Sequence, residues 1–443
     1  MKQNFNLKIS ANLPNTGFSL DELVIETKRM FETEGMVGFL RLLLTLLDYL
    51  VYLPLIGKNE KPFCCEECYL VVAQKESKKL VTSCGLLEFI WTRLKCKSCG
   101  KTIIPLRGFL SLEKYQTKTS ELEQIVAEVV SEQSFRRASQ HLEAIGNIPV
   151  PHTRLHRWVM KSDCDEIDAK KKVQTIIGDG TGYKKKPVNG SNRGEVRLVV
   201  GVTKDGVVVP YGAWTEESWQ SIGQQIKQAN HPHPKLYFKP IADMLVTDGE
   251  PGMIRYLKKL AKDHQRCMWH LPYELKPILQ YQDGAEREEA KEQKSELQNI
   301  IEIELPKEDF NKVPLEDKLE LEKQTWEAEK EVDKLIDSFI EKGYNQAATY
   351  LLNAKKNMFS YVRTWLKTGL VNPRVSSVIE RMMREIGRRI KKIGFGWSPE
   401  GAAKMTRIII KRITSANEWD EYWKKRLKLT GKLKINFLEC DLA

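Results

Sequence analysis

Strand-like and helix-like segments alternate between Lys172 and Leu279, and this alternation constrains the fold more than any other feature of the sequence. Two of the segments are β-branched and other apolar runs, TIIGDG and LVTDG, that lead into an Asp-Gly pair. Such a run is typical of a buried strand that stops at a turn. The elements expected in this region are a strand and turn at 172–183, a hairpin across 195–214 that turns at Asp205–Gly206, a helix at 218–229, a strand at 241–249 and a helix at 251–262.

The order strand, hairpin, helix, strand, helix is typical of a ribonuclease-H-like α/β core. Residues 280–375 are rich in Glu and Lys at helical spacing and have few strand signals, which predicts a helical insertion. A final helical stretch at 376–413 is expected to return the chain to the core. The predicted fold class is therefore multidomain α/β, with smaller modules ahead of the core.

Three acidic residues lie where such a core would bring them together. Asp179 and Asp248 follow the two strand-like runs, and Glu380 opens a helix loaded with arginine. Ligands gather where the ends of neighbouring strands meet in an open α/β sheet. Mg²⁺ (or Mn²⁺) takes oxygen ligands, and two such ions can activate an attacking oxygen and stabilise a leaving one. We therefore predict a catalytic triad that binds Mg²⁺ for phosphodiester chemistry, although a single Asp-Gly aspartate is usually structural.

The distribution of charge indicates a polyanionic partner. The chain has a net charge of +12, yet the segment between Tyr281 and Tyr344 contains 20 acidic and 10 basic residues, which leaves +22 for the rest. A basic body of this kind favours nucleic acid, although charge alone is also consistent with mere solubility. Arg384 and Arg388 follow Glu380 at helical spacing, so we expect them to bind DNA phosphates beside the metal site.

One apolar stretch, Met36–Gly57, is long enough to span a bilayer. It contains Arg41 and Asp48, which are costly inside a membrane and, seven residues apart, share one helical face. We expect an amphipathic helix packed on protein or on a second subunit rather than a membrane span. Nine cysteines, an odd number, without a cleavable signal segment favour a reducing, cytoplasmic and nucleoid-associated setting.

Two Cys-x₂-Cys pairs, Cys65/Cys68 and Cys96/Cys99, are separated by 27 residues. Such pairs are typical of a tetrahedral zinc ribbon, with a hairpin that includes residues 86–95 between the two knuckles. We therefore predict a structural Zn²⁺ bound by these four thiolates, with packed free thiols as the alternative. The spacing assigns no role to Cys64 or Cys84.

Residues 134–162 predict a helix-turn-helix. A helix at 134–144 is followed by a turn around Gly146–Pro151, and a second helix begins near His152. Arg154 and Arg157 on the second helix are donors suited to phosphates and base edges, so we expect them to bind DNA. Leu155 and Trp158 would lie in the core. The alternative is a helical hairpin without a role in binding.

Two further segments carry a family resemblance. SSVIERMMREIGRRIKKIGFGWSPEGAAKMTRIIIKRITSANEW (376–419) resembles the closing region of Mutator-type prokaryotic DDE transposases of insertion sequences, and HQRCMWHLPYELK (264–276) resembles their Cys-x₂-His element. The resemblance covers about a third of the chain. It implies that Asp179, Asp248 and Glu380 are catalytic, that Cys267 and His270 support the active site, and that a long insertion before the glutamate is normal. The N-terminal ribbon departs from typical relatives, so the subfamily is left open.

The residues themselves leave the role of Cys267 and His270 open. At i and i+3 they would face the same side of a helix, and with two further ligands, His264 being one candidate, they could bind Zn²⁺. A nucleophilic cysteine is disfavoured because no orienting third group is evident. A packing or hydrogen-bonding role near the triad is the favoured interpretation.

These observations predict a DDE transposase that binds insertion-sequence ends, hydrolyses the phosphodiester at each end and joins the 3′-hydroxyl to target DNA. A homo-oligomer on DNA is expected, with no membrane and no small-molecule substrate. The alternatives are a transposase-derived DNA-binding regulator without chemistry and a ribonuclease-H-fold nuclease of repair or recombination. The expected domains are an N-terminal helical region (1–60), a zinc-ribbon-like module (61–118), a helix-turn-helix domain (119–170), the first part of the catalytic core (171–279), the helical insertion (280–375), and closing helices with a C-terminal tail (376–443).

Overall fold

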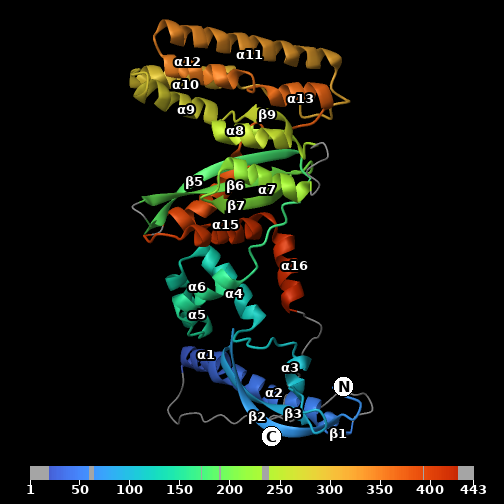
Figure 1. The fold of residues 1–443 in the computed structure, drawn as a ribbon. Coiled ribbons are helices and arrows are strands. Elements are labelled where there is room, and N and C mark those ends of the chain that lie inside the picture. Colours follow the sequence, from blue (N-terminus) through green and yellow to red (C-terminus); the bar gives the residue numbers. More distant parts are fainter. Residues whose placement is uncertain are drawn as a thin grey trace. The chain divides into compact units, whose positions relative to one another are not determined.

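The computed structural model describes residues 19–58, 64–170, 172–188, 191–231, 239–392 and 394–427. The chain divides into two compact units, and each is described here by itself (Figure 1). The first unit comprises Met1–Lys161 together with Arg426–Ala443, and the second comprises Ser162–Lys425. Both mix helices and strands, so the chain is a multidomain α/β protein as the sequence predicted.

A five-stranded mixed sheet with strand order β7-β6-β5-β8-β9 forms the base of the second unit. Its antiparallel half joins β5 to β6 and β6 to β7, whereas β5 pairs in parallel with β8, and β8 with β9. The hairpin between β6 and β7 turns where it was predicted, because Gly206 adopts φ +76° and its N–H binds the Thr203 carbonyl. The strands are β5 (Thr175–Val188), β6 (Ser191–Val202), β7 (Val208–Thr215), β8 (Ala242–Thr247) and β9 (Ala261–Arg266).

Helices cover both faces of this sheet. On one face Ile176, Val199 and Leu245 pack against α7 (Trp219–Asn230) and α8 (Pro251–Leu257). The residues that alternate with them along the strands are also buried, and α15 (Pro399–Thr414) packs against β6 and β7 (Figure 1). Caps define the helix starts, since Ser218 accepts the Ser221 N–H at α7 and Ser398 accepts the Gly401 N–H at α15.

The edge strand β9 was not predicted. The expected helix at 251–262 stops at Leu257, and after a 3₁₀ turn at Lys258–Leu260 the chain becomes extended. The sequence of β9, AKDHQR, lacks an apolar run because the helical insertion satisfies its polar groups. Gln265 donates to the Met358 carbonyl at 2.6 Å and accepts the Tyr361 N–H at 2.9 Å. A contact across 96 residues leaves no local signal in the sequence.

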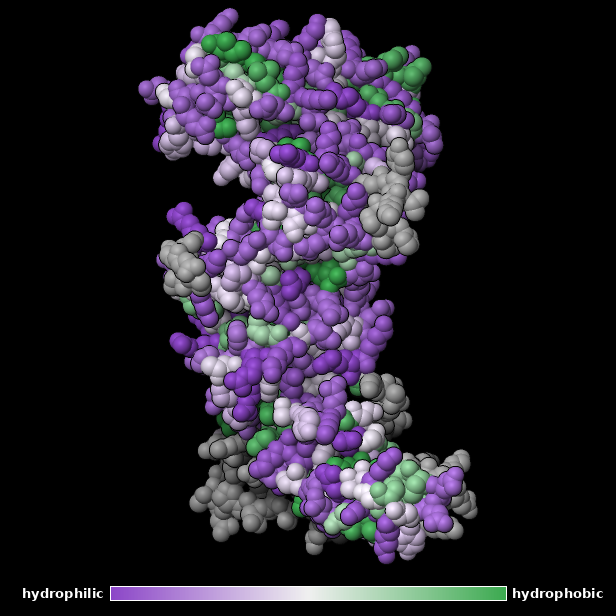
Figure 2. Space-filling model, viewed as in Figure 1, coloured by the Kyte–Doolittle hydropathy of each residue, from purple (hydrophilic) through white to green (hydrophobic). Residues whose placement is uncertain are grey.

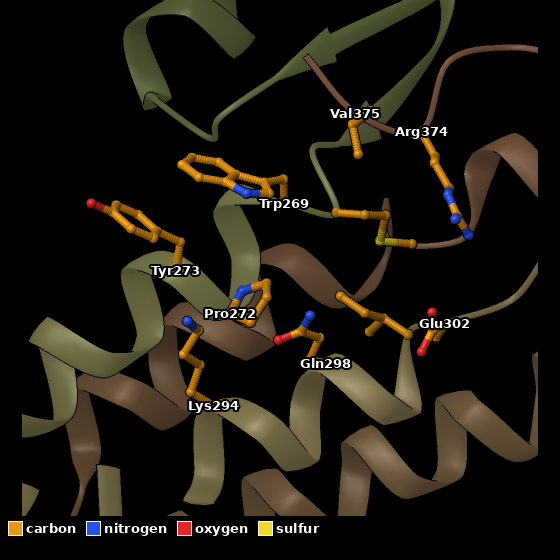
Figure 3. A pocket seen from close by; sticks show the side chains of 10 residues that line it. Trp269, Pro272, Tyr273, Lys294, Gln298, Glu302, Arg374 and Val375 are labelled. Carbon is orange, nitrogen blue, oxygen red and sulfur yellow. The ribbon is translucent and has the colours of Figure 1, made fainter. Parts of the chain in front are cut away.

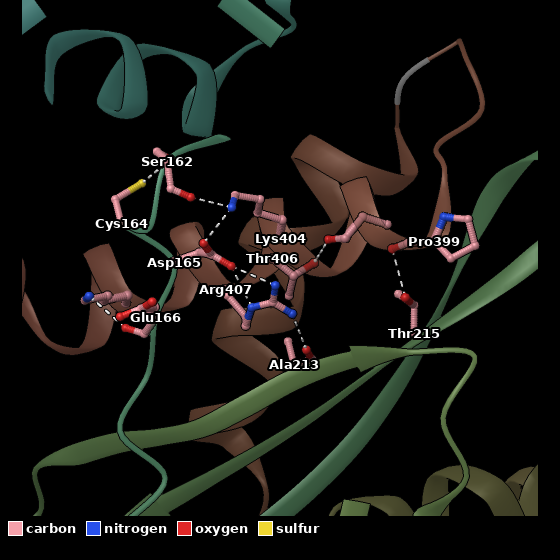
Figure 4. A network of polar contacts seen from close by, with 12 residues as sticks. Ser162, Cys164, Asp165, Glu166, Ala213, Thr215, Pro399, Lys404, Thr406 and Arg407 are labelled. Atoms are coloured by element: carbon pink, nitrogen blue, oxygen red, sulfur yellow. Dashed lines mark hydrogen bonds and ion pairs between the residues drawn. The ribbon is translucent and has the colours of Figure 1, made fainter. Parts of the chain in front are cut away.

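A buried carboxylate secures the segment that leads into this unit. Asp165 lies between Lys404 and Arg407 of α15, at 3.0 and 2.7 Å, and the Arg407 guanidinium also donates to the Ala213 carbonyl on β7 at 3.2 Å (Figure 4). The Asp165 side chain is only 8% exposed. Removing one partner of a buried pair destabilises a protein by about 3–5 kcal/mol, so this network fixes α15 on the sheet.

The helical insertion is present, and its helices have a hydrophobic core of their own. Phe339, Leu351 and Trp365 are at most 1% exposed within that core. On the face seen in Figure 2, hydrophilic residues predominate over these helices. The helices are α9 (His270–Tyr281), α10 (Arg287–Ile300), α11 (Leu315–Glu341), α12 (Asn345–Lys355) and α13 (Ser360–Thr368), followed by the closing helices α14 (Ser377–Ile386), α15 and α16 (Ala416–Leu427).

The first unit contains a four-stranded antiparallel sheet and several helices. The sheet order is β1-β2-β3-β4, and the predicted hairpin between the cysteine pairs is its longest part. Four further helices follow the sheet among the described residues, and two of them match the predicted helix-turn-helix pair. The elements are α1 (Leu20–Arg29), a π-helix at Met30–Gly35, α2 (Met36–Tyr52), a 3₁₀ turn at Leu53–Leu55, β1 (Gly57–Lys58), β2 (Tyr69–Thr82), β3 (Gly85–Cys96), β4 (Thr102–Ile103), α3 (Pro105–Phe109), α4 (Ser120–Glu132), α5 (Phe135–Gly146) and α6 (His152–Lys161).

The apolar helix α2 packs on the sheet, as expected of an amphipathic helix. By length and composition Met36–Leu55, with mean hydropathy 1.8, is long and apolar enough to cross a membrane. Its two charged residues have partners on β3: Arg41 donates to the Glu88 carbonyl at 2.9 Å. Asp48, which is 6% exposed, accepts the N–H and the hydroxyl of Thr92 at 3.1 and 2.7 Å. The charges therefore attach the helix to the sheet.

Candidate active site and metal centre

Asp179 and Asp248 lie at the level of the sheet where β8 ends. The turn predicted within 172–183 is wrong, because β5 continues beyond Asp179 to Val188 by pairing with β6. Asp179 is in β5 and Asp248 directly follows β8, and these strands pair in parallel with Ile177 opposite Val246. Two residues further on, the register brings both aspartates to the same level. Asp179 Oδ1 accepts a hydrogen bond from the N–H of the next residue, Gly180, at 2.7 Å, and Asp248 Oδ1 accepts one from the Glu250 N–H at 2.9 Å. These local bonds orient both carboxylates.

The Asp-Gly turn at Asp248 can be formed only with glycine. Gly249 has φ +108°, and an ideal Cβ there would lie 0.9 Å from Nη1 of Arg266. Arg266 is 6% exposed and is held from the insertion side, with Nη2 at 3.3 Å from Glu274 and 3.0 Å from the Tyr350 hydroxyl. The guanidinium thus occupies the space of the missing side chain. The turn that presents Asp248 is packed directly against a buried cation.

Glu380 reaches the site from the first turn of α14. Its Oε1 accepts a hydrogen bond from the Ser376 hydroxyl at 3.0 Å. That hydroxyl also lies 3.3 Å from Nδ1 of His270 and 3.3 Å from Sγ of Cys267, whose sulfur accepts the Ser376 N–H at 3.3 Å. Cys267, His270 and Ser376 therefore form one hydrogen-bonded group that fixes the start of α14 and, through it, the glutamate.

The electrostatics of Asp179 reflect the convergence of the three acids. Burial raises the pKa of Asp179 to about 7, and the charges of Asp248 and Glu380 act in the same direction, whereas the Gly180 N–H and His270 act against them. Coulombic effects of this kind act over several ångströms, so the three carboxylates lie in the same region of the second unit. Among the described residues, the groups whose ligand atoms lie within 4.8 Å of one another do not include these three acids together. Burial also raises the pKa of Glu250.

The expectation that Cys267 and His270 share one face of a helix is wrong. Cys267 lies after β9, where its N–H binds the Thr247 carbonyl at 2.8 Å, and His270 is the first residue of α9. Burial raises the pKa of the Cys267 thiol, but hydrogen bonds from His270 and Ser376 outweigh it, so the pKa is lowered. The thiol in turn raises the pKa of His270 above its ordinary value, although burial opposes this. The two groups form a polar pair that favours the thiolate and imidazolium.

A metal could also bind at this group, with different ligands from those expected. One ligand atom each from Cys267, His270 and Glu380 lie within 4.8 Å of one another. His264, the other ligand considered from the sequence, is buried on β9, and its Nε2 lies 2.8 Å from the Thr247 hydroxyl. Burial lowers the pKa of His264 to about 4, so it stays neutral. Its role is structural.

The two arginines expected beside Glu380 lie on the surface. Arg384 is exposed, and Arg388 is exposed but pairs with Glu385 at 2.9 Å. The α-helical spacing used to align them ends at Ile386, because residues Gly387–Lys391 form a π-helical turn. This turn rotates Arg389 inward, where it is 2% exposed and stacks on Trp397 at 4.8 Å. Burial lowers the pKa of Arg389 to about 10. π-Turns inside helices are frequent at functional sites.

Sequence reasoning missed Ser376 and Arg266, which position the acids, although both lie within the segments that carry the family resemblance. Ser376 was part of the quoted segment preceding Glu380, and its spacing of four residues from the glutamate was the available signal. Arg266 stands directly before Cys267, but its contact with Gly249 depends on the unpredicted strand β9. Its role could not have been inferred locally.

The cysteine centre lies at the open end of the β2–β3 hairpin in the first unit. The four sulfurs that come within 4.8 Å of one another are those of Cys64, Cys65, Cys96 and Cys99, so this cluster could hold a structural metal such as zinc. The predicted set contained Cys68 in place of Cys64. Cys68 is 1% exposed, packs in the core below the cluster, and touches Cys64 at 3.4 Å. Cys64, by contrast, contacts the second knuckle directly, since its sulfur lies 3.4 Å from that of Cys99.

The thiols differ in how readily they lose a proton. Hydrogen bonds from backbone N–H groups, that of Cys99 foremost, lower the pKa of Cys96 to about 5. Burial followed by the neighbouring thiols raises the pKa of Cys65 to about 11. Four sulfurs cannot all ionise so close together without a cation, and a divalent metal supplies that charge. The donor set therefore fits a thiolate-bound metal.

The helix pair α5 and α6 has the layout expected of a helix-turn-helix. Leu155 and Trp158 are buried, as predicted, whereas Arg154 and Arg157 are exposed on the opposite side of α6. Asn147, in the left-handed conformation at φ 49°, ends α5 and starts the turn. The exposed side of α6 is free of apolar side chains at 152–154 and 156–157. Its basic residues are available to a polyanion.

The fold and the candidate site stand without a match to known sequences. No protein-family model and no curated protein matches this chain. The assignment of a function therefore depends on the residues and the geometry described above.

Proposed function

We propose that the second unit is a metal-dependent phosphodiesterase of the DDE transposase type with a ribonuclease-H-like core. The observation that carries this proposal is the convergence of Asp179, Asp248 and Glu380, from two adjacent parallel strands and a helix start. A sheet of three antiparallel strands followed by two parallel ones, with the acids at β5, after β8 and on a later helix, supports such a core.

The donor set fits Mg²⁺ or Mn²⁺. Carboxylate oxygens are the ligands such ions prefer, and a cation beside Asp179 would offset the cost of burying its charge, which is the main cause of its raised pKa. When bound, the metal would supply Lewis-acid activation of the attacking oxygen and stabilisation of the leaving oxygen. Asp179, Asp248 and Glu380 would hold it. Ser376 keeps Glu380 in position through its hydroxyl.

The side chains around the acids have separate tasks in this proposal. The Cys267–His270–Ser376 group fixes the start of α14, so that Glu380 approaches the two aspartates without searching rotamers. The Arg266 guanidinium packs against Gly249 and so fixes the turn that presents Asp248. Exposed Arg384 would bind DNA phosphates close to the cut. In the first unit, Arg154 and Arg157 of α6 would bind the ends of the element, and Zn²⁺ in the cysteine centre would stabilise the hairpin.

The reaction has two in-line steps at the same group of acids. In the first, water attacks the phosphorus at the end of the element and the 3′-hydroxyl leaves, with the proton of water passing to solvent or to a carboxylate. In the second, that 3′-hydroxyl attacks a target phosphorus and the target 3′-oxygen leaves. No bond to the protein is needed, and the attacking and leaving positions exchange between the steps.

The test is an incubation of the full chain with DNA that contains the element's ends, Mg²⁺ and a target plasmid. Joined products are expected from the native protein. Asp179→Asn, Asp248→Asn and Glu380→Gln should each lower cleavage and joining at least about 10³-fold while DNA binding survives. Glu385→Gln, on the same helix but paired with Arg388, is the matched control and should retain activity. Cleavage without joining would favour a nuclease, and binding without cleavage a DNA-binding regulator.

A further inference from the structure

A hollow beside the candidate active site has an exposed aromatic wall. Trp269 and Tyr273 stack with ring centroids 4.6 Å apart and planes 17° apart. Trp269 is 47% exposed and Tyr273 is 56% exposed. Large aromatic side chains are usually more buried than this, and an exposed aromatic patch often marks a binding site. The hollow has a volume of about 230 Å³ and an apolar floor that includes Met268 and Pro272 (Figure 3).

This hollow adjoins the residues that position Glu380. Trp269 directly precedes His270, and their rings meet edge to face at 4.8 Å. On the other side Val375 lines the hollow and directly precedes Ser376, the residue bonded to Glu380. The backbone closes the arrangement, since the Met268 N–H binds the Arg374 carbonyl at 3.0 Å. A group held in the hollow would lie next to whatever the three acids act upon.

Cationic side chains frame the hollow. Lys294 of α10 points into it beneath the aromatic pair, and Arg374 stands on the opposite side (Figure 3). Among the described residues no carboxylate lies within 4 Å of the Lys294 ammonium, whereas Arg374 is engaged by the Ile303 carbonyl at 2.8 Å and by Glu304 at 3.9 Å. One carboxylate, Glu302, also lines the hollow, so Lys294 is the cation left for a phosphate. A planar apolar wall with a free ammonium nearby suits a ligand with an aromatic face and a phosphate. The volume is below the roughly 300–1,000 Å³ of pockets for drug-sized molecules, so one ring system would fill it.

We propose that Trp269 and Tyr273 form a stacking platform for one unpaired nucleobase of the DNA being cut, with Lys294 on its phosphate. The proposal rests on the function proposed above, and it names where the DNA next to the reacting bond is held. Enzymes that modify a base extrude its nucleotide from the duplex, and proteins that bind single strands stack unpaired bases on aromatic side chains. Stacking of this kind accepts any base, because every base has a π-face.

The first measurement is independent of cleavage. A single-stranded oligonucleotide of about 12 nucleotides with one central 2-aminopurine is titrated with the full chain. Its fluorescence should be quenched by the native protein, and Trp269→Ala should weaken this quenching and the affinity about 10- to 100-fold. Trp269→Phe should retain most of the quenching. The control is Trp326→Ala, which removes a 54% exposed tryptophan on α11 outside the hollow and should change nothing.

The second measurement uses end DNA and Mg²⁺. Trp269→Ala should slow cleavage about 10-fold or more on intact duplex, and an abasic site at the extruded position should restore the rate, because no base then needs a platform. Equal quenching by native and Trp269→Ala protein would overturn the proposal, whether or not the native protein cleaves. Quenching that depends on Trp269 in a protein that cuts no DNA would leave the platform standing and refute the proposed chemistry.

Discussion

Asp179→Asn should make the metal-free protein more stable while it destroys the proposed activity. The carboxylate is partly buried near two others, and its pKa is raised from 3.8 to about 7. At 1.36 kcal/mol per pKa unit, ionising this group in the folded protein costs roughly 4 kcal/mol more than in the unfolded chain. Asparagine has the same shape and can still accept the Gly180 N–H. It removes the charge without removing the contact.

The pH dependence has a definite sign. Below about pH 4 Asp179 is protonated in both the folded and the unfolded chain, so the variant and the native protein should be equally stable. As the pH rises from about 4 to 7, the unfolded chain ionises and the folded protein does not, so the native protein loses stability relative to the variant. Above pH 7 the difference should level off, with about 4 kcal/mol as its upper limit.

The assay is denaturant unfolding of the full chain, without added divalent metal, at intervals between pH 4.5 and 8.5 with the transition of the second unit followed. Mg²⁺ should then narrow the difference at pH 8, since at 100 times its dissociation constant a ligand stabilises the folded state by about 2.7 kcal/mol. The variant lacks one ligand and should gain less. A variant that is no more stable than the native protein at pH 8, or a difference that does not grow with pH, would refute the reasoning.

Three other tests, which use five substitutions, address the remaining features. Gly249→Ala should lower stability by at least about 2 kcal/mol in thermal unfolding and abolish cleavage, because φ +108° is strained for alanine and a guanidinium fills the space; unchanged unfolding would contradict that packing. Cys64→Ser should weaken zinc binding far more than Cys68→Ser does. Zinc affinity is measured by competition with a chromophoric chelator, and the reverse ranking would restore the predicted ligand set. Arg154→Ala should cost about 1–3 kcal/mol of preference for end DNA over scrambled DNA, whereas Arg384→Ala should weaken binding to both alike and flatten its salt dependence; equal behaviour of the two variants in salt titrations would show that α6 does not read sequence.

The elements that the sequence predicted well are those set by local chemistry. Ser218 and Pro251 mark helix starts, and Asp205–Gly206 marks the hairpin turn, because capping, fixed φ and left-handed glycine act within a few residues. The strand end at Asp248 was visible for the same reason, whereas β5 continues past Asp179 to Val188 as one arm of a hairpin that was not predicted. A buried parallel strand is a continuous apolar run with an abrupt polar end.

What the sequence did not reveal depends on distant partners. Strand β9 is polar because the insertion satisfies Gln265 from 93 and 96 residues away. The choice between Cys64 and Cys68 could not be made from spacing, because the two lie four residues apart and only the fold brings Cys64 to Cys96 and Cys99 while Cys68 packs in the core. The π-turn after α14 has no signal in the sequence, and within it Arg389 is buried against Trp397. Each is a tertiary effect that overrides a local pattern.

The order of the acids along the chain has a consequence during synthesis. Asp179 and Glu380 are 201 residues apart, and the whole helical insertion is translated between Asp248 and the glutamate. At about 5–20 residues per second, the ribosome needs roughly 10–40 s to travel from the first acid to the last. The sheet can form in that interval while the site still lacks its third carboxylate. Under the proposed function, a nascent chain that lies near the DNA encoding it would be unable to cut that DNA at first. Cutting would have to wait until the insertion has been synthesised and α14 has docked.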